Sequence, residues 1–171
     1  MVQLDETAAT PAASHRDGRR RKKMQLVAGI DYGPLADWLG FHLRLAQIAS
    51  FQAFANEAHQ VDLSPGRFAL LMLIGRNPGI SQTTLSRAHG SDKSTLTPAL
   101  NDLKRRGLIT RGRQKSDRRS YQLALTPAGH QLLARLTVCA ARHDQNLDRI
   151  IGPRDRVRFL RMLRKIHTEL G

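Results

Sequence analysis

The segment from Ser81 to Leu125 constrains the fold most, because helical and strand patterns follow each other within a short span. "SQTTLSRAH" can form a short helix that is capped by Ser81 and ends near His89 and Gly90. A second run with apolar residues at helical spacing follows a short turn and ends at Gly107. Two helices across a glycine-containing turn form a helix-turn-helix, whose second helix can enter a DNA major groove. Such a pair also occurs in other helical proteins.

The second helix of this pair contains a proline, Pro98, where the other residues favour a continuous helix. An interior proline costs a helix about 3 kcal/mol, because it lacks an N–H group and its ring clashes with the preceding turn. Asp92 or Ser94 could also cap the start of this helix. If Thr95 is the cap, Pro98 lies in the first turn, where an N–H group has no acceptor within the helix, and we therefore expect the Thr95 cap. The helix then runs from Thr95 to Arg106, and Lys93 and Ser94 belong to the turn.

Two short runs with alternating character follow this helix. "LITRGR" and "SYQLAL" are separated by "QKSDRR", and in the second run Tyr121, Leu123 and Leu125 share one face. The pattern predicts a β-hairpin with a basic tip, which is a wing that can place arginine in a minor groove. A solvated loop would explain the polar tip. It would not explain why the hairpin and the preceding helix are both basic.

The charge of the chain favours a polyanionic partner. Lys and Arg number 28 against 14 Asp and Glu, which gives a net charge of +14 and an isoelectric point near 11.4. The segment 91–129 carries nine basic and three acidic residues, whereas 31–90 is neutral. A merely soluble basic surface is the alternative, but the excess is concentrated in the predicted helix-turn-helix and wing.

The remaining segments predict a mainly α fold with a small β-hairpin wing, a winged helix-turn-helix dimerised through its terminal helices. Residues 1–30 hold too few large apolar groups to order themselves, so we expect a flexible basic arm. Residues 31–171 are expected to form a single unit. Within it, dimerisation helices at 34–59 and 127–170 flank the winged helix-turn-helix at 64–126.

Cap signals set the ends of these helices. Ser64 and Pro65 are expected to open a helix that stops at "NPG", and Thr126 and Pro127 a helix that runs to about Ile151. The pair "GP" after Ile151 separates that helix from a last amphipathic one. Long terminal helices with apolar stripes are best buried against a second copy of the chain.

The motifs "LTPALNDLKRRGLITR", "DRRS" and "LTPAG" together resemble the MarR family of winged-helix transcriptional regulators. The resemblance covers roughly residues 35–170. It implies a homodimer with interlocked terminal helices, a pseudo-palindromic double-stranded DNA operator, and repression relieved by a small ligand. "TLTP" is similar to the organic-hydroperoxide-sensing branch, but the sensing cysteine of that branch lies in the first long helix, and this chain has no cysteine before Cys139.

Contacts to DNA are expected from both helices and the wing. Thr95, Thr97 and Pro98 should face base edges, Lys93, Arg111 and Arg113 should hold phosphates, and Arg118 or Arg119 should enter a minor groove. The full set of candidate DNA-binding residues is Ser81, Gln82, Thr83, Lys93, Ser94, Thr95, Thr97, Pro98, Asn101, Arg111, Arg113, Arg118 and Arg119.

The effector is indicated by "WLGFHLRLAQ", which resembles the first helix of MarR-type repressors of aromatic-acid catabolism, including those that respond to hydroxycinnamoyl-CoA thioesters. The resemblance implies a small aromatic effector, with a CoA thioester as one form. Arginines of the arm and of the last helix could bind its phosphates, or they could instead strengthen DNA binding. The candidate ligand-binding residues are Trp38, Phe41, His42, Arg44, Arg67, Phe68 and Met72.

Other classes of protein fit the sequence less well. Catalysis would need clustered carboxylates, a metal set or a nucleophile with its base, so we expect no enzyme activity, no metal and no cofactor. A metal-responsive regulator using His42, His59 or His143, a redox-responsive one using Cys139, and a sequence-indifferent DNA-binding protein stay open. Without an apolar run of about 18 residues or a signal segment, we expect a cytoplasmic chain and no membrane partner.

Overall fold

The structure is a computed structural model, and it describes residues 26–58, 61, 63–113 and 121–170. The chain divides after Asp37 into two compact units. The first contains one turn of 3-10 helix, η1 (Gly33–Ala36), preceded by a hydrogen bond from the Gly33 N–H to Asp31 Oδ1 at 2.8 Å. The division does not test the predicted boundary between an arm at 1–30 and a unit at 31–171.

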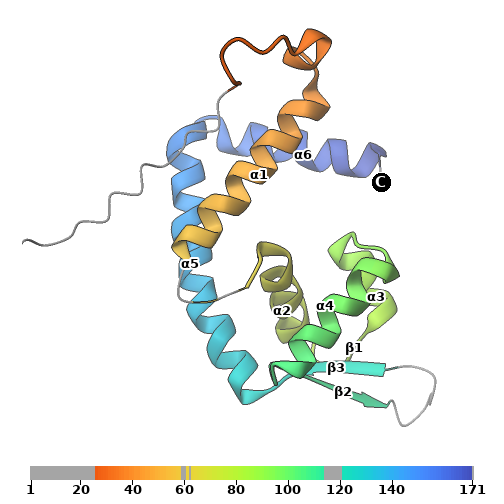
Figure 1. Cartoon of the computed structure of the whole chain (residues 1–171). Helices are drawn as coiled ribbons and strands as arrows, with labels where there is room; N and C mark the ends of the chain where they lie inside the picture. The colour runs from red at the N-terminus through yellow and green to blue at the C-terminus, as the bar shows by residue number, and fades with distance from the viewer. Residues whose placement is uncertain (1–25, 59–60, 62, 114–120, 171) are drawn as a thin grey trace, which may run out of the picture. The chain divides into compact units, whose positions relative to one another are not determined.

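The second unit holds six helices and a small sheet among the described residues. The elements are α1 (Leu39–Glu57), α2 (Pro65–Arg76), β1 (Ile80–Ser81), α3 (Gln82–His89), α4 (Lys93–Arg105), β2 (Ile109–Arg113), β3 (Tyr121–Leu125), α5 (Pro127–Ile151) and α6 (Arg156–Leu170). Figure 1 shows α2, α3 and α4 gathered beside the sheet, with the long α5 running from the sheet to α1. The predicted mainly α fold with a β-hairpin is confirmed.

The sheet is antiparallel in the order β1-β3-β2. Ile109 pairs with Leu125 and Arg111 with Leu123, which fixes the register of the hairpin, and Ile80 pairs with Leu123 from the other side. Leu123 therefore lies on the central strand and is fully buried. The two-residue strand β1 was absent from the sequence prediction, because a bridge this short leaves no alternating pattern.

Three of the helix starts follow their predicted caps. The hydroxyls of Ser64, Ser81 and Thr126 each accept a hydrogen bond from the N–H three residues later. Helix α5 ends at Ile151 as expected, and Gly152 is its C-cap. Gly90 ends α3 with a φ of 70°, the left-handed conformation that glycine adopts without strain.

The core lies in the winged helix-turn-helix. Fully buried side chains come from α2, α3, α4, β3 and α5, namely Leu71, Ile74, Leu85, Leu103, Leu123 and Leu136. Helix α1 contributes Phe54, and Cys139 of α5 packs against the cluster from a half-buried position, as expected of a small apolar residue. No side chain of α6 is buried among the described residues.

The start of α5 is pressed against the start of the hairpin. The Thr126 N–H donates to the Leu108 carbonyl at 3.0 Å, and the Thr126 hydroxyl donates to the Gly107 carbonyl at 2.7 Å. A Cβ on Gly129 would lie 2.0 Å from the Leu108 oxygen, so only glycine fits there. The "LTPAG" motif thus joins the winged helix-turn-helix to the long helix that follows it.

The predicted helix over 34–59 is wrong in its first part. Trp38 has an extended backbone, with φ −82° and ψ 123°, and separates the turn after Gly33 from α1. Leu35 and Leu39 are exposed, so packing of an apolar face does not extend the helix across these residues. The end predicted at His59 falls on a residue outside the described ones, while α1 itself ends at Glu57.

The predicted Thr95 cap is also wrong, because Asp92 caps α4. Asp92 Oδ1 accepts hydrogen bonds from the Ser94 hydroxyl at 2.7 Å and from the Thr95 N–H at 2.8 Å. A carboxylate is a stronger acceptor than a hydroxyl and is favoured at the positive end of a helix. Lys93 and Ser94 therefore belong to the helix, and Pro98 is its sixth residue.

No described helix combines the length and the hydropathy that a membrane span requires.

Candidate nucleic-acid interface

Helix α4 presents a continuous exposed face to solvent. Ser94, Pro98 and Asn101 follow each other at spacings of four and three, and all three are exposed. Lys93 and Thr95 in the first turn are exposed as well. The opposite face inserts Leu96, Leu100 and Leu103 into the core, which fixes the rotation of the helix about its axis. Most of the predicted α4 contacts therefore lie on its accessible side.

Gln82 connects three elements of the winged helix-turn-helix. Its Nε2 donates to Thr97 Oγ1 at 3.0 Å, and its Oε1 accepts from Arg111 Nη2 at 3.0 Å. The amide thereby links α3 to α4 and to β2. Thr97 is half-buried, so its hydroxyl serves this link, whereas the sequence predicts a base contact for it. Arg111, predicted to hold a phosphate, is positioned beside the first turn of α3.

Asp102 links α4 to α2. Its carboxylate lies 3.2 Å from Arg67 Nε and also pairs with Arg105 on the next turn of α4. The Asp102 side chain is 17% exposed, so this ion pair is partly shielded from water. Arg67, a predicted effector contact, thus faces the helix that is predicted to read DNA.

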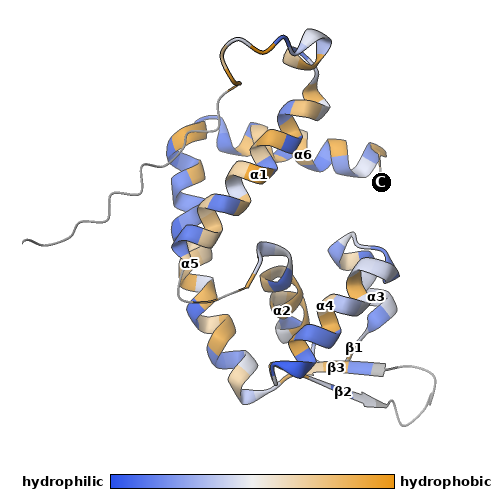
Figure 2. Cartoon of the chain, viewed as in Figure 1, coloured by the Kyte–Doolittle hydropathy of each residue, from blue (hydrophilic) through white to orange (hydrophobic). Residues whose placement is uncertain are grey.

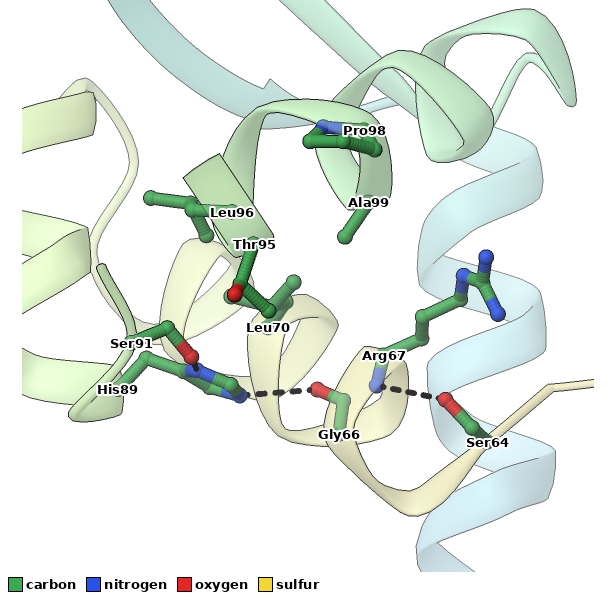
Figure 3. Close-up of a pocket in the computed structure, with 10 residues that line it drawn as sticks. All are labelled: Ser64, Gly66, Arg67, Leu70, His89, Ser91, Thr95, Leu96, Pro98 and Ala99. Atoms are coloured by element: carbon green, nitrogen blue, oxygen red, sulfur yellow. Dashed lines mark hydrogen bonds between the residues drawn. The ribbon is translucent and has the colours of Figure 1, made fainter. Parts of the chain in front are cut away.

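A pocket of about 280 Å³ lies between α2, the α3–α4 turn and α4. Figure 3 shows the His89 ring between Ser91 and the Gly66 carbonyl. His89 Nε2 lies 3.1 Å from the Gly66 oxygen, and His89 Nδ1 lies 2.6 Å from Ser91 Oγ. Because a carbonyl can only accept, Nε2 donates and, in the neutral ring, Nδ1 accepts from the Ser91 hydroxyl. The start of α2 is thereby tied to the turn that precedes α4. Of the predicted ligand-binding residues, only Arg67 is among those lining this pocket.

The other predicted DNA contacts are placed unequally. Ser81 caps α3, and Thr83 is exposed in the first turn of that helix. Arg113 ends β2. The wing-tip residues Arg118 and Arg119 lie outside the described residues.

The predicted ligand-binding residues are divided between α1 and α2. Trp38, His42 and Arg44 are exposed at the start of α1, and Phe41 meets the His42 ring edge-on with centroids 6.0 Å apart. On α2, Phe68 stacks against Phe54 at 5.5 Å, and Met72 is half-buried.

A polar seam runs between α1 and α5. Ser50 Oγ lies 2.9 Å from His143 Nε2, and Phe54 meets the His143 ring edge-on at 6.0 Å. Asn146 donates to Glu57 at 3.3 Å further along the seam. His143, considered above as a metal ligand, is thus used in helix packing. In the part of the chain that the structure describes, no three His, Cys, Asp or Glu side chains form a cluster that could hold a metal.

Helix α6 is basic and joined to α5 at its start. Arg156 pairs with Asp148 and, at 2.9 Å, with Asp144, and these hydrogen bonds raise the pKa of Arg156. Further along, exposed basic side chains follow the helix, namely Arg158, Arg161, Arg164 and Lys165.

Sequence comparison identifies the family. The pattern of the MarR family matches residues 63–121, from just before α2 to the first residue of β3. A protein of Thauera aromatica, described as a transcriptional regulatory protein for the hcr operon, is 35% identical over 144 residues, covering 84% of this chain and 87% of the relative. The chain belongs to the MarR family. This confirms the family predicted from "LTPALNDLKRRGLITR" and "LTPAG", and it makes the chain a transcriptional regulator of the MarR type.

Solved MarR-type repressors share the fold. The repressor CouR bound to a 23-mer DNA duplex is 36% identical, with a TM-score of 0.75 over 81% of this chain and 98% of CouR. CouR bound to p-coumaroyl-CoA is 32% identical, with a TM-score of 0.75 over 81% of this chain and 97% of CouR. The similarity extends beyond the winged helix-turn-helix, to most of the length of both chains.

Proposed function

We propose that the chain is a homodimeric repressor that binds a pseudo-palindromic operator through α4 and is released by an aromatic acyl-CoA. The observation that carries the proposal is the exposed face of α4, held by a packed core and flanked by the Gln82–Arg111 link. A helix presented in this way fits a major groove, and the excess of basic residues supplies phosphate contacts. CouR, a MarR-type repressor of the same fold, binds a DNA duplex, which supports the proposal.

Dimerisation is supported by apolar side chains that the single chain leaves in water. Figure 2 shows orange, hydrophobic residues along both α1 and α6. The large exposed apolar residues of the two terminal regions include Leu39, Leu43, Phe51, Val157, Phe159, Met162 and Leu170. Exposed apolar patches of this kind mark protein interfaces, and a two-fold dimer would match the symmetry of a pseudo-palindromic operator.

The class of effector is supported by CouR, which binds p-coumaroyl-CoA. A planar acyl group suits aromatic and thioether side chains such as Phe41, Phe68 and Met72, and its phosphates suit arginine. The ion pair between Arg67 and Asp102 offers a route from effector to DNA. An anion that draws Arg67 away from Asp102 would loosen the link between α2 and α4.

Release from DNA requires a preference of the effector for the conformation that does not bind the operator. A hundredfold loss of operator affinity corresponds to about 2.7 kcal/mol of such preference. By reciprocity, operator DNA must weaken binding of the effector by the same factor.

DNA binding is tested by selecting duplexes from a random pool with the purified full chain. The proposal expects enrichment of a two-fold symmetric sequence, bound at least about a thousandfold more tightly than a scrambled duplex at the same salt concentration. Enrichment of no common sequence, with equal affinity for all duplexes, would instead identify a sequence-indifferent DNA-binding protein.

The effector is tested by titrating the operator complex with p-coumaroyl-CoA, p-coumarate and CoA alone. We expect release at micromolar p-coumaroyl-CoA, and little release by the free acid or by CoA. Release by the free acid at an equal or lower concentration would reject the CoA part of the proposal and keep the aromatic part. Arg67→Met should reduce the response, whereas Arg105→Met, which removes the other partner of Asp102, serves as the matched control. Release by an oxidant or by a metal ion alone would favour a redox- or metal-responsive regulator.

A further inference from the structure

Pro98 occupies the middle of the exposed face of α4. Successive residues of an α-helix are turned by about 100°, which places Pro98 opposite the mean direction of the buried Leu96, Leu100 and Leu103. Figure 3 shows Pro98 and Ala99 leaving the helix in different directions. Whatever α4 contacts with its outer face, Pro98 is near the centre of that contact.

The proline changes the hydrogen bonding of the residue one turn before it. In an α-helix the Ser94 carbonyl accepts a hydrogen bond from the N–H of residue 98, and proline has none. Ser94 and Pro98 are both exposed, so the carbonyl deprived of this donor lies on the outer side of the helix. Carbonyls on the solvent side of a helix tilt outward, which makes this oxygen available to an external donor.

The helix cannot remove this feature by shifting its start. The Asp92 carboxylate accepts from the Thr95 N–H at 2.8 Å, and the Asp92 carbonyl accepts from the Leu96 N–H at 3.0 Å. These bonds fix the register of the first turn before Pro98 is reached. An interior proline costs a helix about 3 kcal/mol, so stability of α4 does not explain it.

We propose that Pro98 determines the DNA sequence that the chain prefers, by leaving the Ser94 carbonyl to accept a hydrogen bond from the amino group of an adenine or a cytosine in the major groove. Those amino groups are the donors that base pairs present in that groove, and they are absent from guanine and thymine there. A backbone acceptor therefore discriminates between bases as a side-chain amide oxygen would. This inference rests on the proposed function, because it needs α4 in a major groove.

The test compares Pro98→Val and Pro98→Ala with the full-length parent chain. Valine keeps an apolar side chain and restores the N–H that returns the Ser94 carbonyl to the helix, while alanine also removes the bulk. Each protein is titrated with the selected operator and with its single base-pair substitutions, and Asn101→Ala is the matched control on the same face. A second probe replaces the candidate adenine by purine, or the candidate cytosine by pyrimidinone, both of which lack the amino group.

We expect the parent to lose about tenfold in affinity when the amino group is removed at one symmetry-related position. Pro98→Val and Pro98→Ala should be indifferent to that removal and keep the preference at every other position, and both should melt at or above the parent temperature. Asn101→Ala should keep the discrimination at that position. The inference would be overturned if both variants had the same base preferences as the parent. It would also be overturned if both variants melted at a lower temperature than the parent, because the role of the proline would then be structural. A parent chain without any preferred duplex would instead refute the proposed function.

Discussion

The winged helix-turn-helix and the terminal helices contain similar leucine-rich patterns but use them differently. Leu71, Leu85 and Leu103 are completely buried within one chain. In contrast, Leu39 at the start of α1 is 78% exposed and Leu170 near the end of α6 is 84% exposed. Since both regions repeat apolar residues at helical spacing, the pattern alone does not say whether the partner face lies in the same chain. The apolar side chains of the first region are thus covered within the chain, whereas the described residues leave those of the second region exposed.

Polar contacts differ in the same way. In the winged helix-turn-helix, Gln82 links three elements and Asp102 links two helices. In α6, the contacts to α5 described above are made by Arg156 at the first turn, and the arginines that follow are exposed. Side-chain contacts thus connect the elements of the winged helix-turn-helix to one another, whereas the contacts described for α6 lie in its first turn.

The largest expected effect tests whether the winged helix-turn-helix is closely packed. Gly129→Ala places a methyl group against the Leu108 carbonyl, which belongs to the backbone and cannot move aside cheaply. We expect a loss of about 3 kcal/mol or more in the free energy of unfolding, measured by urea denaturation. Gly66→Ala is the control, because nothing lies within 4 Å of its Cβ position. Equal stability of the two variants would show that the packing is looser than described.

The next effect tests whether α6 needs a second copy. Met162→Glu replaces a side chain that is 52% exposed in the single chain, so it should leave a monomer unchanged. If a partner covers this face, burying the charge should weaken dimerisation by about 2 kcal/mol or more. Sedimentation equilibrium measures the change, and Arg161→Gln on an exposed position of the same helix is the control. An unchanged dimer would remove α6 from the interface.

A smaller effect concerns the link through Gln82. Gln82→Ala removes the hydrogen bonds to Thr97 and Arg111, and we expect a loss of about 1 kcal/mol in stability together with weaker operator binding. Gln82→Glu keeps the acceptor for Arg111 but removes the donor to Thr97. It should therefore bind DNA better than Gln82→Ala at equal salt. Operator affinity that is the same for all three proteins would mean that the link does not position Arg111 for DNA.

The smallest effect concerns the Asp92 cap and its dependence on pH. The hydrogen bond from the Ser94 hydroxyl, followed by that from the Thr95 N–H, lowers the pKa of Asp92 below its ordinary value of 3.8. A depressed pKa in the folded state contributes stability that is present above the unfolded pKa and is lost as pH falls through the folded one. Asp92→Ala should therefore lose less stability than the parent between about pH 5 and about pH 2. Thermal melts across this range test it, with Glu169→Gln as the control, and parallel curves for parent and Asp92→Ala would contradict it.

Local signals made much of the fold predictable. Ser64, Ser81 and Thr126 mark helix starts by chemistry that acts within three residues, and Gly90 and Gly152 mark helix ends. The hairpin followed from alternation of Leu123 and Leu125 with polar neighbours. Such features depend on the chain next to them, so the sequence is enough to find them.

The errors arose where two local signals compete. Asp92 and Thr95 are both acceptable caps, and the reluctance to place a proline inside a helix favoured Thr95, whereas the carboxylate wins. Between Pro34 and Leu39 the apolar spacing favours a helix, but the exposed leucines give it no packing energy, and the chain is extended at Trp38.

The links within the candidate site had no local signal. Gln82 meets Arg111, Arg67 meets Asp102, and His89 meets Gly66, all across distances along the chain that no motif spans. The sequence predicts contacts to DNA or effector for Gln82, Arg67 and Arg111, but it carries no signal for their partners, nor for Asp102 and His89. The roles of these residues in binding stay predictions.

The most direct test of the central claim is the stoichiometry of the specific complex. Sedimentation velocity of the full chain with the selected operator, compared with a scrambled duplex of equal length, measures how many chains bind each duplex. The account predicts two chains per operator, bound together at moderate salt, and little binding to the scrambled duplex under the same conditions. A single chain per operator, or equal binding to both duplexes, would contradict the claim. The claim is that two copies dimerise through their terminal helices and bind one operator with their winged helix-turn-helix regions.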